Sequence, residues 1–416
     1  MSNFIKYSIL IPTFNKIEYV KYAIESVLSI NYEDFELIVS DDFSDDGTWE
    51  YLKSLNDKRL TVIRPPHRLG VTLHYEYLLN ISKGDWVVIL GDDDGLLPYF
   101  FKVLDPILEN KKFRNLEAIS SKPAFYYYEN VEDLYGDRVV YYDNYFEKNQ
   151  IINSKLSFLL CILGIKTRVD LPTIYTAGLF KRSLIERIKK KSKNIFFHSI
   201  VPDYYSMIAG LCETPNFLRV NIPIFWVGTT NKSGGRGLKV YDQESINSGN
   251  NDNSKIFLSK EIPIILHQTG TAPIYFLECI LKHPYSVFFL KKEYIKFLAY
   301  VSSIVYFEQY LITQPWRIKN RISFNEFKYK VTVELYKLNF KKFSIMFFYY
   351  LIKFFFIVDA IYFQFTRVKN FFIRNLSNKN IFLISNNRNL YKNVLDCNKF
   401  IDHIFNKINL DLINKK

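Results

Sequence analysis

The sequence predicts an α/β fold: a doubly wound, mainly parallel sheet with helices on both faces, followed by a C-terminal helical region. Three observations lead to this prediction. Over residues 6–90, short apolar runs alternate four times with segments of helical periodicity. Polar clusters follow several of these runs at the point where a strand would end. From about residue 256, the composition changes to aromatic and lysine-rich sequence with very little glycine.

The expected elements of the N-terminal part follow one another in order. The first strand covers Lys6–Ile11, and a helix over residues 16–30 follows it, because apolar residues recur there at helical spacing. Asn15 and Glu18 resemble a capping box at the start of that helix. The further strands are expected at Phe35–Ser40, Leu60–Arg64 and Trp86–Leu90, with a short helix after the polar turn 44–48 and a longer helix over about 71–82.

Residues 92–94 are three consecutive aspartates that follow the apolar strand Trp86–Leu90. Adjacent like charges repel one another unless a positive group lies among them, and Mg²⁺ or Mn²⁺ binds carboxylate and phosphate oxygens together. A solvated turn is the alternative interpretation. Thr13 and the pair Asp41 and Asp42 stand at the carboxyl ends of two other expected strands, so three polar clusters should converge on one crevice. This convergence favours a metal or ligand role.

These motifs resemble those of the family 2 glycosyltransferases, the inverting GT-A enzymes. The matching segments are Ile11–Asn15, Ser40–Thr48 and Gly84–Pro98. The resemblance covers residues 1–110 well and residues 111–235 loosely. Its Gly-Asp-Asp-Asp form looks most like enzymes that build bacterial surface polysaccharides, and it implies a GT-A-like sheet.

The resemblance implies that the nucleotide of the donor binds at the ends of the first two strands. Thr13 would contact the nucleotide, and its neighbours Pro12 and Asn15 would belong to the same donor site. Asp41 or Asp42 would recognise the base. Donor binding would therefore depend on residues that lie far apart in the sequence but at one edge of the sheet.

The same resemblance assigns the aspartate run to the diphosphate end of the donor. Asp92 would lie near the ribose, and Asp93 would bind the divalent metal, Mn²⁺ or Mg²⁺, that bridges the diphosphate. Asp94 would support that metal or contact the donor sugar. The physical argument agrees, because a divalent cation neutralises the charge that develops on a diphosphate leaving group.

Two positions depart from the family pattern. Members commonly carry an acidic residue at the position of Gly91, so the acidic cluster is shifted here to three consecutive aspartates. Many also carry an Arg-Asn pair at the positions that Tyr75 and Glu76 occupy in this chain. The resemblance therefore does not imply that this helix contacts the phosphates. Three nearby cations could replace them or could belong to a solvated loop: Arg64, His67 and Arg68.

Residues 111–235 are less regular, with a strand expected at Ile174–Phe180 and a basic helix at Lys181–Lys191. In the resembling family, an acidic residue before a helix in this region is the general base, and Asp203 is the matching residue. A carboxylate at a helix N-terminus is kept ionised by the helix dipole, which suits removal of a proton from an acceptor hydroxyl. The alternatives are that Asp203 is a plain N-cap, or that Glu213 is the base.

A glycine-rich segment over residues 228–237 follows the expected strand Ile222–Val227 and contains Lys232 and Arg236. Such a loop with two cations could close over the donor diphosphate, although a flexible linker has the same composition. Residues 242–255 are polar and predict a disordered loop or a domain boundary. The length of 416 residues predicts two or three domains. We expect a nucleotide-sugar-binding half at 1–110, an acceptor-binding half at 111–240, and a C-terminal helical region at 256–416.

The run Phe343–Phe365 in the C-terminal region is long enough to span a bilayer. It contains Lys353, Asp359 and Gln364, however, and charges at the bilayer centre are costly. Lys353 and Gln364 are three helical turns apart and therefore share one face. This favours a helix in the membrane interface, over a helix in the core or one that spans the bilayer.

The formal net charge is +13, from 55 Lys and Arg against 42 Asp and Glu. This excess suits the anionic inner leaflet of a membrane, at about 1 kcal/mol for each well-placed basic residue. The sequence has no zinc-finger, helix-turn-helix or RRM signature, so we expect no nucleic-acid partner. The 4 cysteines are scattered, and the N-terminus has no secretory segment. These features predict a cytoplasmic protein that is peripherally associated with the cytoplasmic membrane.

Together, the residues and the resemblance predict a glycosyltransferase. It would move a sugar from a nucleotide-diphosphate-sugar to a hydroxyl of a lipid-linked glycan in bacterial polysaccharide synthesis, by a metal-assisted displacement that inverts the anomeric centre. One alternative is a sugar nucleotidyltransferase, which would need a glycine-rich loop where residues 12–16 contain no glycine. The other alternative is a non-catalytic binding or scaffold subunit, against which the intact aspartate run argues.

Overall fold

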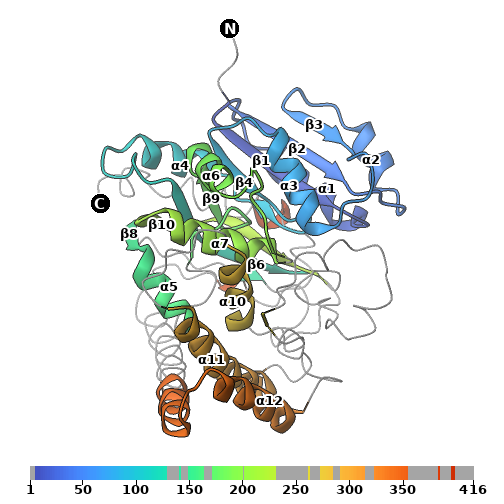
Figure 1. Ribbon diagram of the computed structural model, residues 1–416. Helices are drawn as coiled ribbons and strands as arrows, with labels where there is room; N and C mark the ends of the chain where they lie inside the picture. The colour runs from blue at the N-terminus through green and yellow to red at the C-terminus, as the bar shows by residue number, and fades with distance from the viewer. Residues whose placement is uncertain are drawn as a thin grey trace.

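The computed structural model has a central sheet with helices on both sides and a group of helices at one end (Figure 1). The described residues are 5–128, 140–141, 149–163, 171–199, 201–230, 261–262, 272–283, 291–313, 323–354, 383–384 and 395–398.

The N-terminal half of the sheet is parallel. Its strands are β1 (Tyr7–Thr13), β2 (Phe35–Asp41), β3 (Leu60–Ile63) and β4 (Trp86–Ile89), and they lie in the order β3-β2-β1-β4. The register places Thr13 beside Asp41 at the carboxyl ends of β1 and β2. The chain moves outward from β1 in both directions, to β2 on one side and to β4 on the other. Ligands of open α/β sheets bind outside the strand ends at such a reversal of strand order.

The second half of the sheet is mostly antiparallel. Strand β9 (Gly178–Lys181) joins β4 to β6 (Ala118–Tyr127) and runs antiparallel to both. The long strand β10 (Asn216–Thr229) pairs parallel to β6 and antiparallel to β5 (Gly95–Leu96) and β8 (Gln150–Asn153). Two short strands, β7 (Val140–Tyr141) and β11 (Leu383–Ile384), extend the β6 edge. The prediction of an α/β sheet is confirmed, and its parallel character belongs to the first four strands.

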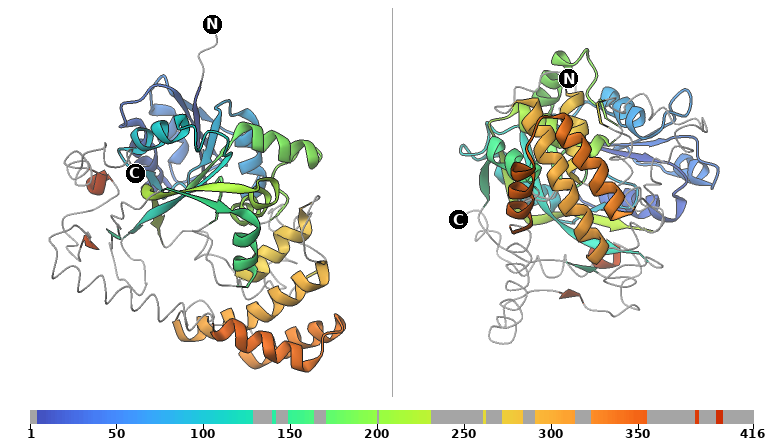
Figure 2. Two further views of the ribbon diagram at one scale, coloured as in Figure 1. Left: turned by 90° about the vertical axis from the view of Figure 1, so that its left-hand side faces the viewer. Right: turned by 60° about the horizontal axis from the view of Figure 1, so that its bottom comes forward.

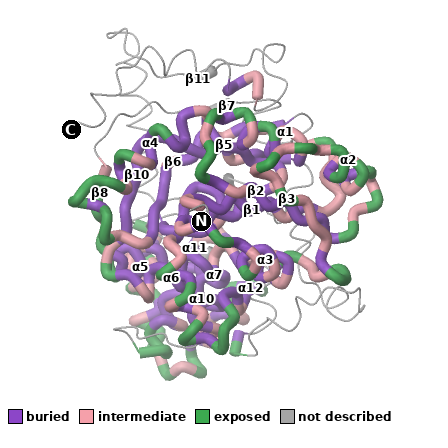
Figure 3. Tube along the Cα trace, turned by 90° about the horizontal axis from the view of Figure 1, so that it is seen from above, coloured by how far each residue is buried: buried purple, intermediate pink, exposed green. Residues whose placement is uncertain are grey.

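Each face of the sheet carries its own apolar core, because successive side chains of a strand point to opposite faces. In β1, Ile9 and Ile11 belong to one core and Leu10 to the other. The Ile9 side is covered by α1 (Ile17–Leu28), α2 (Thr48–Ser54) and α4 (Phe100–Glu109). The Leu10 side is covered by α3 (Val71–Ile81), α5 (Ser154–Ile162), α6 (Arg182–Lys191) and α7 (Pro202–Glu213). Figure 3 shows the central strands, such as β1, β6 and β10, mostly buried, whereas the short strand β8 is mostly exposed.

Most described helices after residue 256 pack on the Leu10 side of the sheet, where their apolar residues join the same core, whereas Cys397 joins the core on the Ile9 side. The described helical segments of this region are α10 (Ala272–Lys282), α11 (Lys292–Thr313), α12 (Phe324–Lys337) and the helical residues 342–354 and 395–398. Figure 2 shows α11, α12 and the helical residues 342–354 stacked together at one end of the molecule. None of the helices in the described part of the chain is both long and apolar enough to cross a membrane.

Most expected elements coincide with observed ones, and two local details differ. The capping box expected at Asn15 and Glu18 is wrong: the N-cap of α1 is Lys16, and the amide of Ile17 donates to Asp46 Oδ2 at 3.1 Å. A carboxylate from the loop after β2 therefore caps this helix. The strand expected over residues 174–180 forms regular pairs only from Gly178, with an isolated bridge between Ile89 and Tyr175 before it.

Candidate functional site

The aspartate cluster, defined as Asp92, Asp93 and Asp94, lies in a tight turn just after β4. The amide of Asp94 donates to the carbonyl of Gly91 at 3.0 Å, which closes the turn. Strand β5 begins at the next residue, Gly95, and pairs with β10 through Trp226. The turn is therefore held between β4, in the parallel half of the sheet, and β10, in the antiparallel half.

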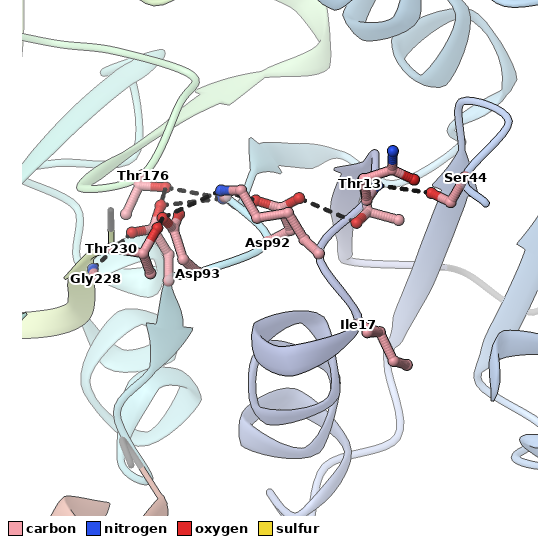
Figure 4. Close-up of polar contacts among 12 residues, drawn as sticks. Thr13, Ile17, Ser44, Asp92, Asp93, Thr176, Gly228 and Thr230 are labelled. Atoms are coloured by element: carbon pink, nitrogen blue, oxygen red, sulfur yellow. Dashed lines mark hydrogen bonds and ion pairs between the residues drawn. The ribbon is translucent and has the colours of Figure 1, made fainter. Parts of the chain in front are cut away.

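Asp94 is bonded to groups from three other parts of the chain. Its Oδ1 accepts from the amide of Gly228 at 2.8 Å, and its Oδ2 accepts from the hydroxyl of Thr176 and from the amide of Gly91 at 3.1 Å (Figure 4). Burial and the charge of Asp93 raise the pKa of Asp94 to about 7, although the bonds from Thr176 and Gly228 favour its ionised form. These bonds give Asp94 a structural role at the turn. The metal or sugar contact that we predicted for Asp94 stays a prediction.

The position of Asp94 explains the departure at Gly91. A Cβ atom at residue 91 would overlap the Asp94 carboxylate and the hydroxyl of Tyr175. The space that an acidic side chain at position 91 would enter is thus already filled by a carboxylate from three residues further along. Asp94 supplies the single buried acidic group at this point of the turn, and Gly91 leaves the space that its carboxylate needs.

Asp92 and Asp93 face a common position, and the ammonium of Lys16 occupies it. Lys16 Nζ lies 3.0 Å from Asp92 Oδ1 and 3.2 Å from Asp93 Oδ2. The side chains are mostly buried, with exposed fractions of 12% for Lys16, 13% for Asp92 and 8% for Asp93. Asp92 Oδ2 also accepts from the hydroxyl of Thr13 at 3.0 Å, and Asp93 Oδ2 accepts from that of Thr230 at 3.2 Å (Figure 4).

The donor set around this position fits a hard divalent cation. Among the described residues, no three His, Cys, Asp or Glu side chains are grouped as they would be for a metal held by protein alone. Mg²⁺, however, is usually held by one or two carboxylates, with waters and substrate phosphates as its other ligands. Asp92 and Asp93 provide two such carboxylates on either side of a position that already holds a cation. They could therefore hold Mg²⁺ or Mn²⁺.

A buried hydroxyl without a partner lies near the same carboxylates. Tyr128 is 5% exposed, and its hydroxyl makes no hydrogen bond in the described part of the chain. Burial raises the pKa of Tyr128 far above its usual value, and the charge of Asp93 adds to this effect. A buried polar group that lacks a partner costs free energy, so a ligand oxygen at this place would be stabilised by it.

The first loop of the site, residues 13–17, is fastened to the loop after β2. Asn15 has a positive φ of 53°, its amide donates to Ser44 Oγ at 2.8 Å, and its side-chain oxygen accepts from the amide of Asp45 at 2.9 Å. The cap of α1 by Asp46 adds a third link between the two loops. The predicted donor residues Pro12, Thr13 and Asn15 thus lie on one rigid edge. Their contacts with a nucleotide stay a prediction.

Asp41 and Asp42 both engage in internal hydrogen bonds. Asp41 accepts from Arg64 Nε at 2.6 Å, and the Arg64 guanidinium lies 4.5 Å from the ring centre of Trp49. Asp42 accepts from the amides of Leu69 and Gly70, at 2.8 and 2.9 Å, just before α3 begins. The predicted recognition of the base by these carboxylates is not tested by these contacts. Of the three nearby cations, Arg64 is paired with Asp41, whereas His67 and Arg68 are exposed.

Asp203 is the second residue of α7, one position inside the helix, and Val201 is the N-cap. It is therefore not the plain N-cap that we considered as an alternative. Burial raises the pKa of Tyr75, and the charges of Asp203, Asp92 and Asp94 raise it further, so all three carboxylates act on this ring. Asp203 and the aspartate cluster therefore lie within electrostatic range of the same half-buried tyrosine.

Glu76 and Glu213 have structural contacts. The Glu76 Oε2 atom accepts from the amides of Phe196 and Phe197 at 2.9 and 3.0 Å, and it thereby fastens the segment that leads to α7. Glu213, the alternative base, is the last residue of α7 and pairs with Lys191 at 2.6 Å. Glu76 therefore holds the segment before α7, which carries Phe196 and Phe197, against α3.

Sequence reasoning missed three residues of the site and named two that lie outside the described residues. The missed residues are Lys16, Thr176 and Thr230, and only Lys16 left a signal: a cation at the start of a helix, where the dipole disfavours it. Thr176 and Thr230 reach the cluster from distant strand ends. Lys232 and Arg236, the cations of the predicted lid, lie in the part of the chain that the structure does not describe.

Comparison with known proteins supports the predicted fold. Residues 8–164 match the model of the family described as glycosyl transferase family 2. A segment of 87 residues is 32% identical to the UDP-Glc:alpha-D-GlcNAc-diphosphoundecaprenol beta-1,3-glucosyltransferase WfaP of Escherichia coli, and covers 21% of this chain and 35% of the relative. A segment of 95 residues is 33% identical to the GalNAc(5)-diNAcBac-PP-undecaprenol beta-1,3-glucosyltransferase of Campylobacter jejuni, and covers 22% of this chain and 31% of the relative. The chain thus spans about a third of the length of these relatives.

A solved structure extends the likeness beyond the matched segment. TarS 1-349 of Staphylococcus aureus, in complex with UDP-GlcNAc, superimposes with a TM-score of 0.51 over 80% of this chain and 81% of that chain, at 12% identity. At this identity the likeness concerns the fold alone, and it agrees with the GT-A-like sheet expected from the sequence. Residues 8–164 therefore match glycosyl transferase family 2, and the fold agrees with this match.

Proposed function

We propose that this protein transfers a sugar from a nucleotide-diphosphate donor to a hydroxyl group of a lipid-linked glycan during bacterial polysaccharide synthesis. The observation that carries the proposal is the convergence of Thr13, Asp92 and Asp93 at the carboxyl ends of β1 and β4, within a family 2 domain. The lipid-linked acceptor is taken from the names of the E. coli and Campylobacter relatives, both of which act on undecaprenol-linked sugars.

In the proposed mechanism, the donor lies along the carboxyl edge of β1 and β4 with its diphosphate toward Asp92 and Asp93. These two carboxylates would hold Mg²⁺ or Mn²⁺, which when bound neutralises the charge that builds up on the leaving diphosphate. Thr13 orients Asp92 through its hydroxyl. Asp94, fixed by Thr176 and Gly228, keeps the turn in the shape that presents its two neighbours.

Asp203 is the proposed general base. Its carboxylate at the N-terminus of α7 accepts the proton of the acceptor hydroxyl while the new glycosidic bond forms and the bond to the diphosphate breaks. A displacement in one step from the face opposite the leaving group inverts the anomeric centre. Glu76 supports this arrangement, because it fixes the backbone of Phe196 and Phe197 ahead of α7.

The proposal is tested by a transfer assay with the full chain. Nucleotide sugars based on UDP, CDP, GDP and dTDP are offered with Mn²⁺ and an undecaprenyl-diphosphate-linked sugar, and the lipid product is identified by mass spectrometry. We expect one donor to add a single sugar in the inverted configuration. Binding of a nucleotide without transfer to any acceptor tested would instead favour the non-catalytic alternative.

We further propose that the protein meets the membrane through an apolar helix face at its C-terminal end. On the helical residues 342–354, large exposed side chains recur at a spacing that places them on one side: Phe343, Met346, Phe347, Tyr350 and Phe354. The opposite side packs inward, for example Phe348 on Phe297. Two exposed lysines at the start of the helix, Lys341 and Lys342, suit an anionic lipid surface. We propose that this helix face binds the cytoplasmic surface of the membrane.

Replacement of Phe343 and Phe347 by glutamate is expected to weaken binding to phosphatidylglycerol vesicles by at least about tenfold, because apolar burial is lost and negative charge is added. Co-sedimentation of the full chain with vesicles measures the effect. The matched control replaces Val71 and Ile195, which are exposed elsewhere on the molecule, by glutamate. Equal loss of binding in both double variants would refute docking through this helix.

A further inference from the structure

Lys16 occupies the position that a metal would need. Its ammonium bridges Asp92 Oδ1 and Asp93 Oδ2 at 3.0 and 3.2 Å, and these oxygens belong to the two carboxylates that would hold the cation. An ammonium and a divalent cation cannot both lie between the same two oxygens. The two occupants are therefore mutually exclusive.

The backbone around Lys16 is built to hold the side chain there. Lys16 is the N-cap of α1, where a positive charge is disfavoured by the helix dipole, so the helix itself gains nothing from this residue. The flanking residues are both fastened to the loop after β2: Asn15 through Ser44 and Asp45, and Ile17 through Asp46. The stem of the lysine thus starts from a rigid point beside the aspartates.

The ammonium of Lys16 and the carboxylates of Asp92 and Asp93 stabilise one another's charged forms. Burial by itself lowers the pKa of Lys16, but the charges of Asp92 and Asp93 outweigh this effect and raise it overall. The ammonium in turn favours the ionised form of Asp92, whose pKa burial would otherwise raise further. The lysine therefore relieves the repulsion between the adjacent carboxylates. From the sequence we had expected a metal ion to do this.

We infer that Lys16 is an internal counterion that competes with the divalent cation for Asp92 and Asp93, and that it must leave this position before the cation can bind. This inference rests on the proposed function, because it concerns the same two carboxylates. It implies that the protein without donor binds a divalent cation weakly. Phosphate oxygens of a donor supply further ligands to the cation, so nucleotide and metal together displace the ammonium more readily than metal alone.

The test is a titration of the full chain with Mn²⁺ in the absence of nucleotide, with free Mn²⁺ followed by electron paramagnetic resonance. Lys16→Met is expected to bind Mn²⁺ at least about tenfold more tightly than the natural protein, because the competing charge is gone. Lys16→Arg keeps the charge and is expected to bind as weakly as the natural protein. Lys102→Met, an exposed lysine on α4, makes the same change in net charge and should have no effect.

Two further measurements keep the outcome clear. A thermal melt shows whether each variant is folded, and adding Asp93→Asn to Lys16→Met should abolish the gain in Mn²⁺ affinity. If folded Lys16→Met binds Mn²⁺ no more tightly than the natural protein, the inference is overturned. If it binds more tightly while no donor sugar is transferred by the natural protein, the inference stands and the proposed function fails.

Discussion

Asp203→Asn is expected to lower kcat for glycosyl transfer by about 100- to 10,000-fold, the usual contribution of a general base. Asparagine has nearly the same shape and can occupy the start of α7, but it cannot accept the proton of the acceptor hydroxyl. Because the donor diphosphate is proposed to bind at Asp92 and Asp93, and Asp203 is proposed to act on the acceptor, donor affinity should change little. Steady-state kinetics with the donor found in the transfer assay, together with calorimetric binding of its nucleotide, separates the two effects.

Glu213→Gln is the matched control for this experiment, because it removes a carboxylate from the other end of the same helix. Glu213 is ten residues further along α7, which corresponds to about 15 Å. Its pairing with Lys191 indicates a structural role, so kcat should stay within a few-fold of the natural protein. An Asp203→Asn variant with normal kcat, or a larger loss in Glu213→Gln, would contradict the assignment of the base.

Gly91→Asp is expected to reduce the free energy of unfolding by about 3–5 kcal/mol. The new side chain would overlap the Asp94 carboxylate and the Tyr175 hydroxyl, and it would bury a second charge beside Asp94. Urea denaturation with an unchanged m-value measures the loss.

A double-mutant cycle makes this prediction specific to the pair. Asp94→Ala alone should be destabilising, because the amide of Gly228 and the hydroxyl of Thr176 lose their acceptor. The combination of Gly91→Asp with Asp94→Ala should cost less than the sum of the two changes, by about 1–3 kcal/mol, since one carboxylate then takes the place of the other. If the costs of the two single changes simply add, the carboxylate at position 91 does not replace that of Asp94.

The parallel half of the sheet could be predicted from the sequence because each strand is a short apolar run with a polar end. The strands ending at Thr13, Asp41 and Ile89 lie within about one or two residues of their expected limits. Once strands and helices alternate, the topology places these ends at one edge, so the proximity of Thr13 to Asp92 followed from local patterns alone.

The contacts that Gly228 and Lys16 make with the aspartate cluster could not be predicted from local sequence patterns. Strand β10 is buried along almost its whole length, so it has no alternating pattern, and its pairing with β6 shifts between Val220 and Phe225. Nothing in the sequence therefore indicated that Gly228 would donate to Asp94. Likewise, the bridge from Lys16 to Asp92 and Asp93 joins residues more than 70 positions apart. Pairings between charges at that separation depend on the fold.

We propose that Asp92 and Asp93 bind the diphosphate of a nucleotide donor through a divalent cation. Thermal unfolding of the full chain with UDP, CDP, GDP or dTDP, each with and without Mn²⁺, tests it most directly. At about a hundredfold excess over its Kd, one nucleotide should stabilise the protein by about 2.7 kcal/mol when Mn²⁺ is present, and Asp93→Asn should remove the part that depends on Mn²⁺. A folded Asp93→Asn variant that keeps the full Mn²⁺-dependent stabilisation would contradict the claim.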